Sequence, residues 1–271
     1  LTVMTIAFRE REMILDFLEG LTGLRMNHAY IRPGGLAQDI PLGLTDFVRS
    51  VMPNIKNDIG ELEALLMENP ILKSRFVGVG EISLSAAMAM GLTGPCVRAA
   101  GYPLDMRKIK PYCGYETYDF DVVTWDTQDA YGRFRIRLEE TWQSLRIVEQ
   151  CLERLERTQG QPVMVGDAKI VWPASLALGP DGQGNSHEHV KHIMGESMEA
   201  LIHHFKIVTE GFKVPVGQVY QAIESPKGEL GCPLVPDGGP RPYRAHFRDP
   251  GFNHLQSVPM MCIGSLKTIS R

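Results

Sequence analysis

The segment from Asp129 to Arg157 constrains the fold most, because it carries the strongest helical pattern in the sequence. Its apolar residues recur every three or four positions, the period of one helix face: Phe134, Leu138, Trp142, Leu145, Val148, Leu152 and Leu155. At 1.5 Å per residue this pattern predicts a helix of about 40 Å. Its other face mixes charges of both signs, as a solvated or interface face does.

Three further segments show the same helical period. They lie at about 4–20, 44–69 and 187–210, and the Asn69-Pro70 pair is expected to end the second one. A brief helix is predicted over 85–91, within a stretch that glycine and proline break into short elements. The chain is therefore expected to be mostly helical.

Strands are predicted near the C-terminal end of the sequence. The segments 219–223 and 230–235 flank the turn text SPKGELG, and another strand is expected near 243–248. The fold class is therefore α+β, mainly α, with a long-helix body and a small C-terminal β-hairpin region. We expect 1–271 to form a single domain, with a flexible excursion at about 158–186 where Gly, Pro and Asp dominate.

Composition excludes several classes of protein. The chain has 271 residues, 44% apolar and 22% charged, which can bury a sizeable core. A net charge of −4 argues against nucleic acid as a partner, and no apolar run approaches the roughly 20 residues that span a bilayer. Basic residues near Arg98 and Arg107 are expected to pair locally or to form a docking surface.

The five cysteines are far apart and include no CxxC pair. Such spacing suits neither a zinc ribbon nor an iron–sulfur cluster held by this chain alone. Their odd number favours reduced thiols in a cytoplasmic setting. The sequence also begins within an apparent helix, which indicates a fragment of a longer protein.

Histidines offer the one arrangement that resembles a metal site. Three of them and a carboxylate stand together in HEHVKH: His187, Glu188, His189 and His192. No further ligand set accompanies them, so adventitious or no metal binding is favoured over a real site. His203 and His204 are adjacent in a predicted helix, where a hydrogen-bonded core histidine is favoured over a proton relay.

Two loops concentrate polar groups. The loop 25–35 brings together Arg25, His28, Tyr30 and Arg32 near a pair of glycines, which suits a buried functional surface or a purely structural loop. The hairpin places Glu224, Glu229 and Asp237 around Lys227, and neutralising partners across the turn explain them without catalysis. GxGxxG, P-loop and GxSxG motifs are absent.

Several stretches together resemble one family, the D or 49-kDa subunits of respiratory NADH:quinone oxidoreductase (complex I). They are FRERE (8–12), GLRMNHAYIRPGG (23–35), QDIPLGL (38–44), DMRKIKPYCGYETYDFDV (105–122), QSLRIVEQCLERL (143–155), GESMEALIHHFKIVTEGF (195–212), ESPKGELG (224–231) and DGGPRPYRAHFRDPGF (237–252). The similarity covers nearly all of residues 3–256, in order.

The resemblance implies a fold similar to the large subunits of nickel–iron hydrogenases. It implies a subunit of a proton-translocating enzyme that helps to form the quinone-reduction region. This chain alone would bind no cofactor or metal; quinone is the substrate, and the neighbouring iron–sulfur cluster belongs to a partner subunit. Implied partners are the cluster-bearing subunit, a 30-kDa-type subunit and a membrane-arm subunit. The implied location is peripheral, on the cytoplasmic side of the plasma membrane or the matrix side of the mitochondrial inner membrane.

The resemblance also suggests Asn27, His28 and Arg32 as the residues of the quinone and cluster region. Many family members carry a histidine at the position of Asn27. The resemblance implies that this histidine changes its protonation when the cluster is reduced. An amide at this position cannot titrate near neutral pH. The family's quinone-binding histidine and tyrosine would precede Leu1. No catalytic residue is therefore assigned, and the chain is expected to be inactive alone.

Two other hypotheses remain open. One is the large subunit of a membrane-bound energy-converting nickel–iron hydrogenase, which would need cysteine pairs that this sequence does not contain. The other is a non-catalytic assembly module that only binds sister subunits.

Overall fold

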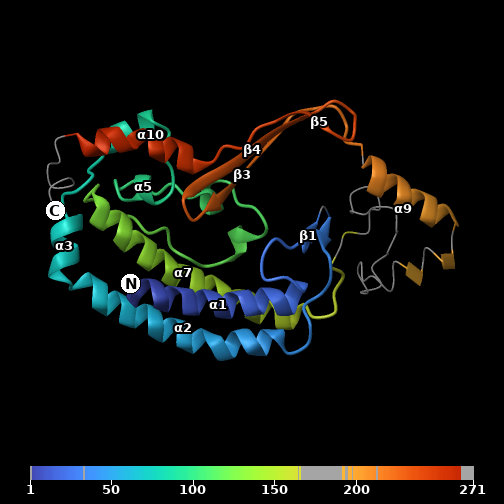
Figure 1. The fold of residues 1–271 in the computed structure, drawn as a ribbon, viewed down its shortest axis with the longest axis horizontal. Helices are drawn as coiled ribbons and strands as arrows, with labels where there is room; N and C mark the ends of the chain where they lie inside the picture. Colours follow the sequence, from blue (N-terminus) through green and yellow to red (C-terminus); the bar gives the residue numbers. More distant parts are fainter. Residues whose placement is uncertain are drawn as a thin grey trace. The chain divides into compact units, whose positions relative to one another are not determined.

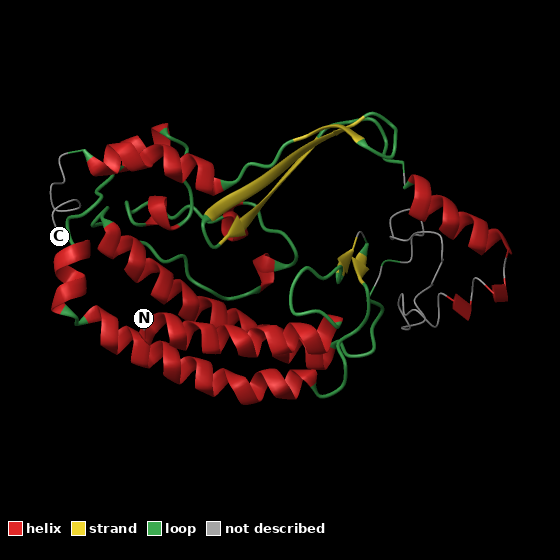
Figure 2. Cartoon of the chain, viewed as in Figure 1, coloured by secondary structure: helices red, strands yellow, loops and turns green. Residues whose placement is uncertain are grey.

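A computed structural model describes residues 2–32, 34–163, 165, 191–192, 195–196, 198–211 and 213–263 (Figure 1). The chain divides into two compact units, one formed by 1–58 with 152–214 and the other by 59–151 with 215–271. Helices and small antiparallel sheets make up both (Figure 2), in agreement with the predicted α+β, mainly α class. The single-domain expectation stays a prediction, and most of the excursion at 158–186 lies outside the described residues.

The first unit is built on helices. Its elements are α1 (Thr2–Thr22), the start of α2 (Leu44–Met67), the end of α7 (Ala130–Arg157), the two-residue strands β1 (Ile31–Arg32) and β2 (Gly35–Leu36), and α9 (Met198–Glu210). Arg9 on α1 pairs with Asp58 on α2 at 2.5 Å, and Arg49 on α2 pairs with Glu156 on α7 at 2.5 Å. These ion pairs show that the three helices lie side by side in this unit.

The second unit combines short helices with a three-stranded sheet. Besides the remainder of α2 and α7, it contains α3 (Pro70–Phe76), α4 (Leu84–Ala89), α5 (Pro95–Arg98), α6 (Met106–Ile109), the 3-10 turn η1 (Tyr115–Thr117), β3 (Val219–Ser225), β4 (Gly228–Pro236), β5 (Pro242–Ala245) and α10 (Pro250–Cys262). Its core packs Ile82, Ala87, Leu92, Cys96 and Val97 together. The sheet order is β3-β4-β5, antiparallel throughout.

The helix α7 begins where its sequence provides a capping group. Asp129, which is 3% exposed, accepts hydrogen bonds from the N–H of Gly132 at 2.8 Å and of Gly78 at 2.9 Å. The Thr127 hydroxyl donates to the same carboxylate at 2.7 Å. Burial alone would raise the pKa of Asp129, but these hydrogen bonds hold that pKa below its ordinary value. A carboxylate at the start of a helix accepts hydrogen bonds from backbone N–H groups of the first turn, which have no partner within the helix.

Most elements predicted from the sequence are confirmed. The expected helices correspond to α1, α2, α4, α7 and α9, and the expected strands to β3, β4 and β5. The start of the helix predicted at 187–210 lies outside the described residues. No helix in the described part of the chain is long and apolar enough to cross a membrane.

Three features differ from the predictions. Asn69-Pro70 does end α2, but it also begins α3, because the Asn69 side chain accepts the Ile71 N–H at 2.9 Å. Most of the short β1–β2 ladder lies in the predicted loop at 25–35, where Arg32 pairs with Gly35. The helix α10 was missed, although Asp249 followed by Pro250 is a helix-start pattern, and the Asp249 side chain accepts the Gly251 N–H.

Candidate functional site

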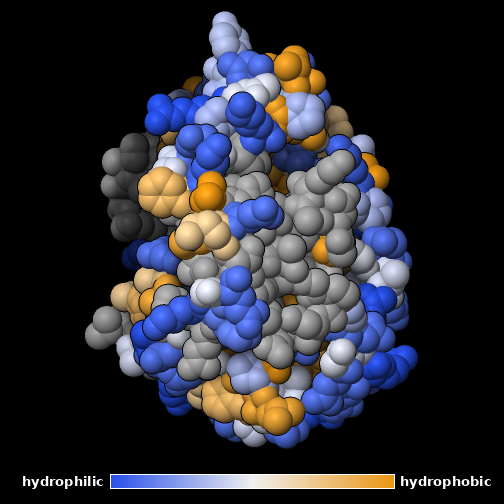
Figure 3. Space-filling view, turned by 90° about the vertical axis from the view of Figure 1, so that its right-hand side faces the viewer, coloured by the Kyte–Doolittle hydropathy of each residue, from blue (hydrophilic) through white to orange (hydrophobic). Residues whose placement is uncertain are grey.

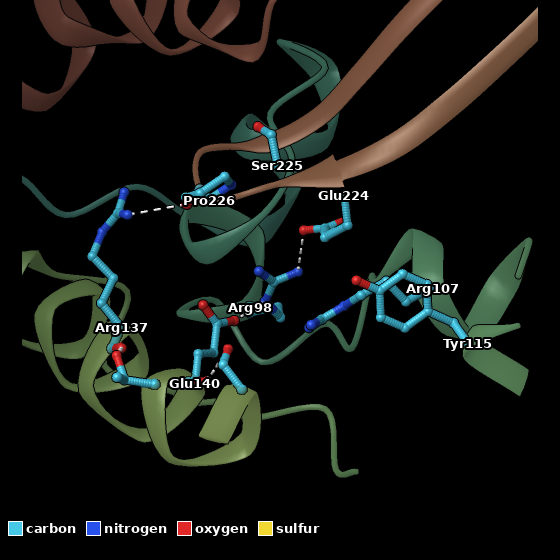
Figure 4. A pocket seen from close by; sticks show the side chains of 10 residues that line it. Arg98, Arg107, Tyr115, Arg137, Glu140, Glu224, Ser225 and Pro226 are labelled. Atoms are coloured by element: carbon cyan, nitrogen blue, oxygen red, sulfur yellow. Dashed lines mark hydrogen bonds and ion pairs between the residues drawn. The ribbon is translucent and has the colours of Figure 1, made fainter. Parts of the chain in front are cut away.

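A polar hollow of about 400 Å³ lies in the second unit, where α7 faces the turn between β3 and β4 (Figure 4). Three arginines, two glutamates and three hydroxyl side chains line most of it: Arg98, Arg107, Arg137, Glu140, Glu224, Thr141, Ser144 and Ser225. Tyr115 and Pro226 complete the lining. The hollow therefore fits polar rather than apolar ligands.

Arg98 is the centre of this arrangement and is only 2% exposed. Its Nη1 donates to Oε1 of Glu224 at 2.8 Å and to the carbonyl of Leu104 at 2.7 Å. Its Nε lies 2.6 Å from Oε1 of Glu140, an ion pair without hydrogen-bond geometry. Burial raises the pKa of Glu140, and the charge of Arg98 opposes that rise. One arginine thus pairs with carboxylates from two elements that are far apart in sequence.

A second buried pair supports the first. Arg107 donates from Nε and Nη2 to the carboxylate of Asp105, which is 1% exposed, at distances of 2.7–3.2 Å. Burial favours the neutral form of Asp105, but the hydrogen bonds and charge of Arg107 outweigh it and lower the pKa of this carboxyl. The guanidinium also lies over the rings of Phe120 and Tyr115, at 4.7 and 5.9 Å from their centroids. Both arginines are thereby fixed in position.

The β3–β4 turn approaches the start of α5 very closely. A Cβ added to Gly94, where φ is +65°, would lie 2.5 Å from Cα of Gly228. One added to Gly228, where φ is +138°, would lie 2.5 Å from the hydroxyl oxygen of Thr93. That hydroxyl accepts the N–H of Glu229 at 3.0 Å. Only glycines permit this contact, which brings Glu224 to Arg98.

Glu224 and Glu229 of the hairpin pair with cations other than Lys227, the neutralising residue that the sequence predicted. Glu224 pairs with Arg98, and Glu229 pairs with Arg248 at 3.2 Å while accepting the Tyr220 hydroxyl at 2.6 Å. Residues 224 and 229 are register partners on β3 and β4. Cations from other elements therefore neutralise them, which sequence separation alone could not show.

The loop predicted to carry the functional residues lies in the first unit. Asn27 has a φ of +57° and is exposed, and the Nε of Arg32 donates to the carbonyl of Ala29 at 3.0 Å. His28 and Tyr30 form an edge-on ring pair with centroids 6.5 Å apart. Within the described residues, the buried Nδ1 of His28 and hydroxyl of Tyr30 have no hydrogen-bond partner. Burial, with the nearby charge of Asp39, raises the pKa of Tyr30.

Asn27, His28 and Arg32 therefore share one loop, but no contact joins their side chains among the described atoms. The sequence prediction singled out this loop and missed the network of Arg98, Glu140 and Glu224. The available signal for that network was a basic residue close to a proline in a buried apolar segment. This signal does not identify its carboxylate partners.

Metal and cluster ligands are not assembled in the described part of the chain, where no three His, Cys, Asp or Glu side chains lie close enough to hold an ion. His187 and His189 lie outside the described residues, whereas His192 contacts Glu196 at 3.4 Å. The side chains of His203 and His204 also lie outside them. All five cysteines are unpaired.

Apolar side chains are exposed in several places. On the face drawn in Figure 3, apolar residues lie in separate patches between polar ones. In the first unit Leu42 is 88% and Ile31 79% exposed, and in the second unit Tyr243 and Phe252 are 78% and 73% exposed. Separate exposed apolar residues of this kind are common on protein surfaces, whereas large contiguous apolar patches mark binding surfaces.

Residues 1–268 match the family described as "Respiratory-chain NADH dehydrogenase, 49 Kd subunit". The chain belongs to this family. It is similar to the D subunit of the NADH-quinone oxidoreductase of Nocardioides sp., with 60% identity over 98% of the chain and 60% of that relative. The D subunit of the Cutibacterium acnes enzyme is 62% identical over 98% of the chain and 61% of that protein. A D subunit from Streptomyces avermitilis is 63% identical over 97% of the chain and 59% of that protein.

The family match confirms the resemblance found in the sequence and favours the quinone enzyme over the hydrogenase hypothesis. The chain spans about 60% of the length of the curated relatives that it matches. The region represented here is therefore the larger part of a family member.

Proposed function

We propose that this chain contributes the scaffold and part of the quinone-reduction region of an NADH:quinone oxidoreductase. The observation that carries the proposal is the match of residues 1–268 to the 49-kDa family, together with relatives that are named as D subunits of NADH-quinone oxidoreductase. Electron transfer from NADH to quinone, coupled to proton translocation, is the activity proposed for the whole complex. This chain supports that activity by shaping a surface for its partners.

The proposal extends to cofactors and to the finer fold relationship. Quinone is the substrate, a partner subunit holds the neighbouring iron–sulfur cluster, and this chain alone binds no cofactor. The long-helix body with its small sheets supports a fold similar to the large subunits of nickel–iron hydrogenases.

The loop at 23–35 is the proposed cluster-facing and quinone-facing element, with Asn27, His28 and Arg32 as its site residues. Its polar atoms support this role, because the buried Nδ1 of His28 and hydroxyl of Tyr30 lack partners within the described chain. Buried polar atoms are normally hydrogen-bonded, so a partner subunit or ordered water completes them. Arg32 supplies a fixed positive charge beside them.

The proposed partners are the cluster-bearing subunit, a 30-kDa-type subunit and a membrane-arm subunit. The exposed apolar residues Ile31 and Leu42 in and beside the loop of the first unit support protein contacts there. The proposed location is peripheral, on the cytoplasmic side of the plasma membrane or on the matrix side of the mitochondrial inner membrane.

A chimaera tests this proposal. Residues 2–263 replace the matching region of the full-length Nocardioides relative, in a strain that lacks its own copy. The chimaera is expected to assemble with its sister subunits and to restore quinone reduction by NADH in membranes. Assembly without quinone reduction would support the non-catalytic assembly module instead, and failure to assemble beside a working parental control would contradict both.

Within the chimaera, Arg32→Gln is expected to lower quinone reduction while leaving NADH oxidation by a soluble artificial acceptor unchanged. Arg157→Gln is the matched control, because Arg157 is an exposed arginine that pairs only loosely with Glu153 at 3.7 Å. Equal quinone reduction in both variants would remove Arg32 from the proposed site.

A further inference from the structure

The hollow beside Arg98 has donors that its own ion pairs do not use. Arg107 bonds Asp105 through Nε and Nη2, so its Nη1 stays available at the hollow. Arg137 donates one hydrogen bond, from Nη1 to the carbonyl of Pro226 at 3.1 Å. The Ser225 hydroxyl has no partner among the described residues, although it lines the same space.

The three arginines of the hollow also differ in whether a carboxylate pairs with them. Arg98 is held between Glu140 and Glu224, and Arg107 is held by Asp105. Arg137 has no carboxylate within ion-pair distance in the described part of the chain, so no ion pair holds its guanidinium group. Figure 4 shows its side chain rising from α7 to the β3–β4 turn, at the opposite end of the hollow from Arg107. An anion would therefore find a free cation at one end and free donors elsewhere.

The lining limits what this anion can be. A volume of about 400 Å³ is that of a small-molecule site rather than of a bare ion. The hydroxyls of Thr141 and Ser144 donate to helix carbonyls at 2.8 and 2.9 Å, which leaves their oxygens as acceptors for a ligand hydroxyl. Two glutamates near the centre disfavour a ligand that is negatively charged along its whole length.

We propose that this hollow binds a small organic anion, a carboxylate or a phosphate monoester with a polar body. Arg137 and Ser225 bind the anionic group, Arg107 Nη1 donates to the other end, and the hydroxyls of α7 accept from the ligand body. The site is distinct from the loop at 23–35 and does not depend on the proposed role of that loop.

Calorimetric titration of the 271-residue chain tests the proposal. Glycerate and glycerol 3-phosphate are the probes, since each has one anionic group and a hydroxyl-bearing body, at an ionic strength kept constant with sodium chloride. We expect saturable binding of at least one probe at one site, and the probe that binds identifies the carboxylate or the phosphate class. Absence of saturable binding by both probes, or a heat that sodium chloride reproduces, would overturn the proposal.

Two variants locate the binding. Arg137→Gln removes the cation that has no ion-pair partner and is expected to weaken binding about tenfold or more, whereas Arg157→Gln on the same helix should leave the affinity within about twofold. Ser225→Ala removes a free donor without changing any charge or described contact, so it is expected to weaken binding without unfolding the chain. Circular dichroism verifies the fold of each variant. If Arg137→Gln and Ser225→Ala both fold and bind as tightly as the parent chain, the hollow is not the site.

Discussion

The network around Arg98 and the loop that carries His28 and Tyr30 differ in how far the chain itself supplies partners for their buried polar groups. Around Arg98 in the second unit, the carboxylates and most donors find hydrogen-bond partners within the chain, and the Arg98 Nε, which has no hydrogen bond, still forms an ion pair with Glu140. In the loop at 23–35 of the first unit, the buried Nδ1 of His28 and hydroxyl of Tyr30 have no hydrogen-bond partner among the described residues. A satisfied network specifies a fold, whereas unsatisfied buried groups indicate a surface completed by something outside the chain. Substitutions in the network should therefore destabilise the chain more than substitutions in the loop.

The largest effect is expected from Arg98→Met. This change leaves the carboxylate of Glu224, whose side chain is 5% exposed, and that of Glu140 without their cation. Breaking a buried pair by removing one member costs about 3–5 kcal/mol. Urea unfolding of the variant should show this loss, and Arg157→Met, at a side chain that is 76% exposed, is the control. A loss as small as that of the control would mean that the network contributes no stability.

Gly94→Ala should weaken the contact between the β3–β4 turn and α5. The new methyl group would meet backbone of Gly228 at 2.5 Å and would sit on a residue with a φ of +65°. Strain and overlap together are expected to cost about 3 kcal/mol. Thermal unfolding measures this cost. Gly217→Ala, where an added Cβ meets nothing within 4 Å, should change the stability by less than about 0.5 kcal/mol.

Asp129→Ala removes the cap of α7 and is expected to cost about 2 kcal/mol at neutral pH. The pKa of Asp129 is lowered in the folded chain, so its contribution is present above the ordinary pKa of an aspartate in the unfolded chain. That contribution is lost as pH falls through the lowered pKa. Urea unfolding at pH 7 and in increasingly acidic buffers should show the wild-type and variant stabilities converge. If the difference in unfolding free energy between wild type and variant grew on acidification, the pKa of Asp129 could not be lowered in the folded chain.

The smallest effects come from a matched pair of tyrosines. The hydroxyl of Tyr112 accepts the N–H of Glu224 at 3.0 Å, so Tyr112→Phe is expected to cost about 1 kcal/mol. The hydroxyl of Tyr30 has no partner among the described residues, so Tyr30→Phe should leave the stability unchanged or raise it. Urea unfolding of both variants tests the comparison. A larger loss at Tyr30 would show that this hydroxyl is satisfied within the chain and would remove the main structural support for a partner at the loop.

The long elements could be predicted from the sequence because their signals are local. The apolar period of α7 and the glycine turn between β3 and β4 each lie within one short stretch, and both elements form as expected. The family resemblance, too, rested on contiguous motifs and was confirmed. Asp249 shows where such signals were present but overlooked, because it caps α10 next to Pro250.

The polar site depended on information that no single stretch contains. Arg98 and Glu224 are 126 positions apart, and they meet because Gly94 and Gly228 allow two backbones to approach. In the sequence Glu224 has a nearer cation in Lys227, which made neutralisation across the turn the simpler expectation. The sequence by itself determined the long helices α1, α2 and α7, the hairpin and the family of this protein, since these follow from local periodicity and contiguous motifs. Only the tertiary structure decided which charges are paired and which stay free, because ion pairing depends on distance and burial in space.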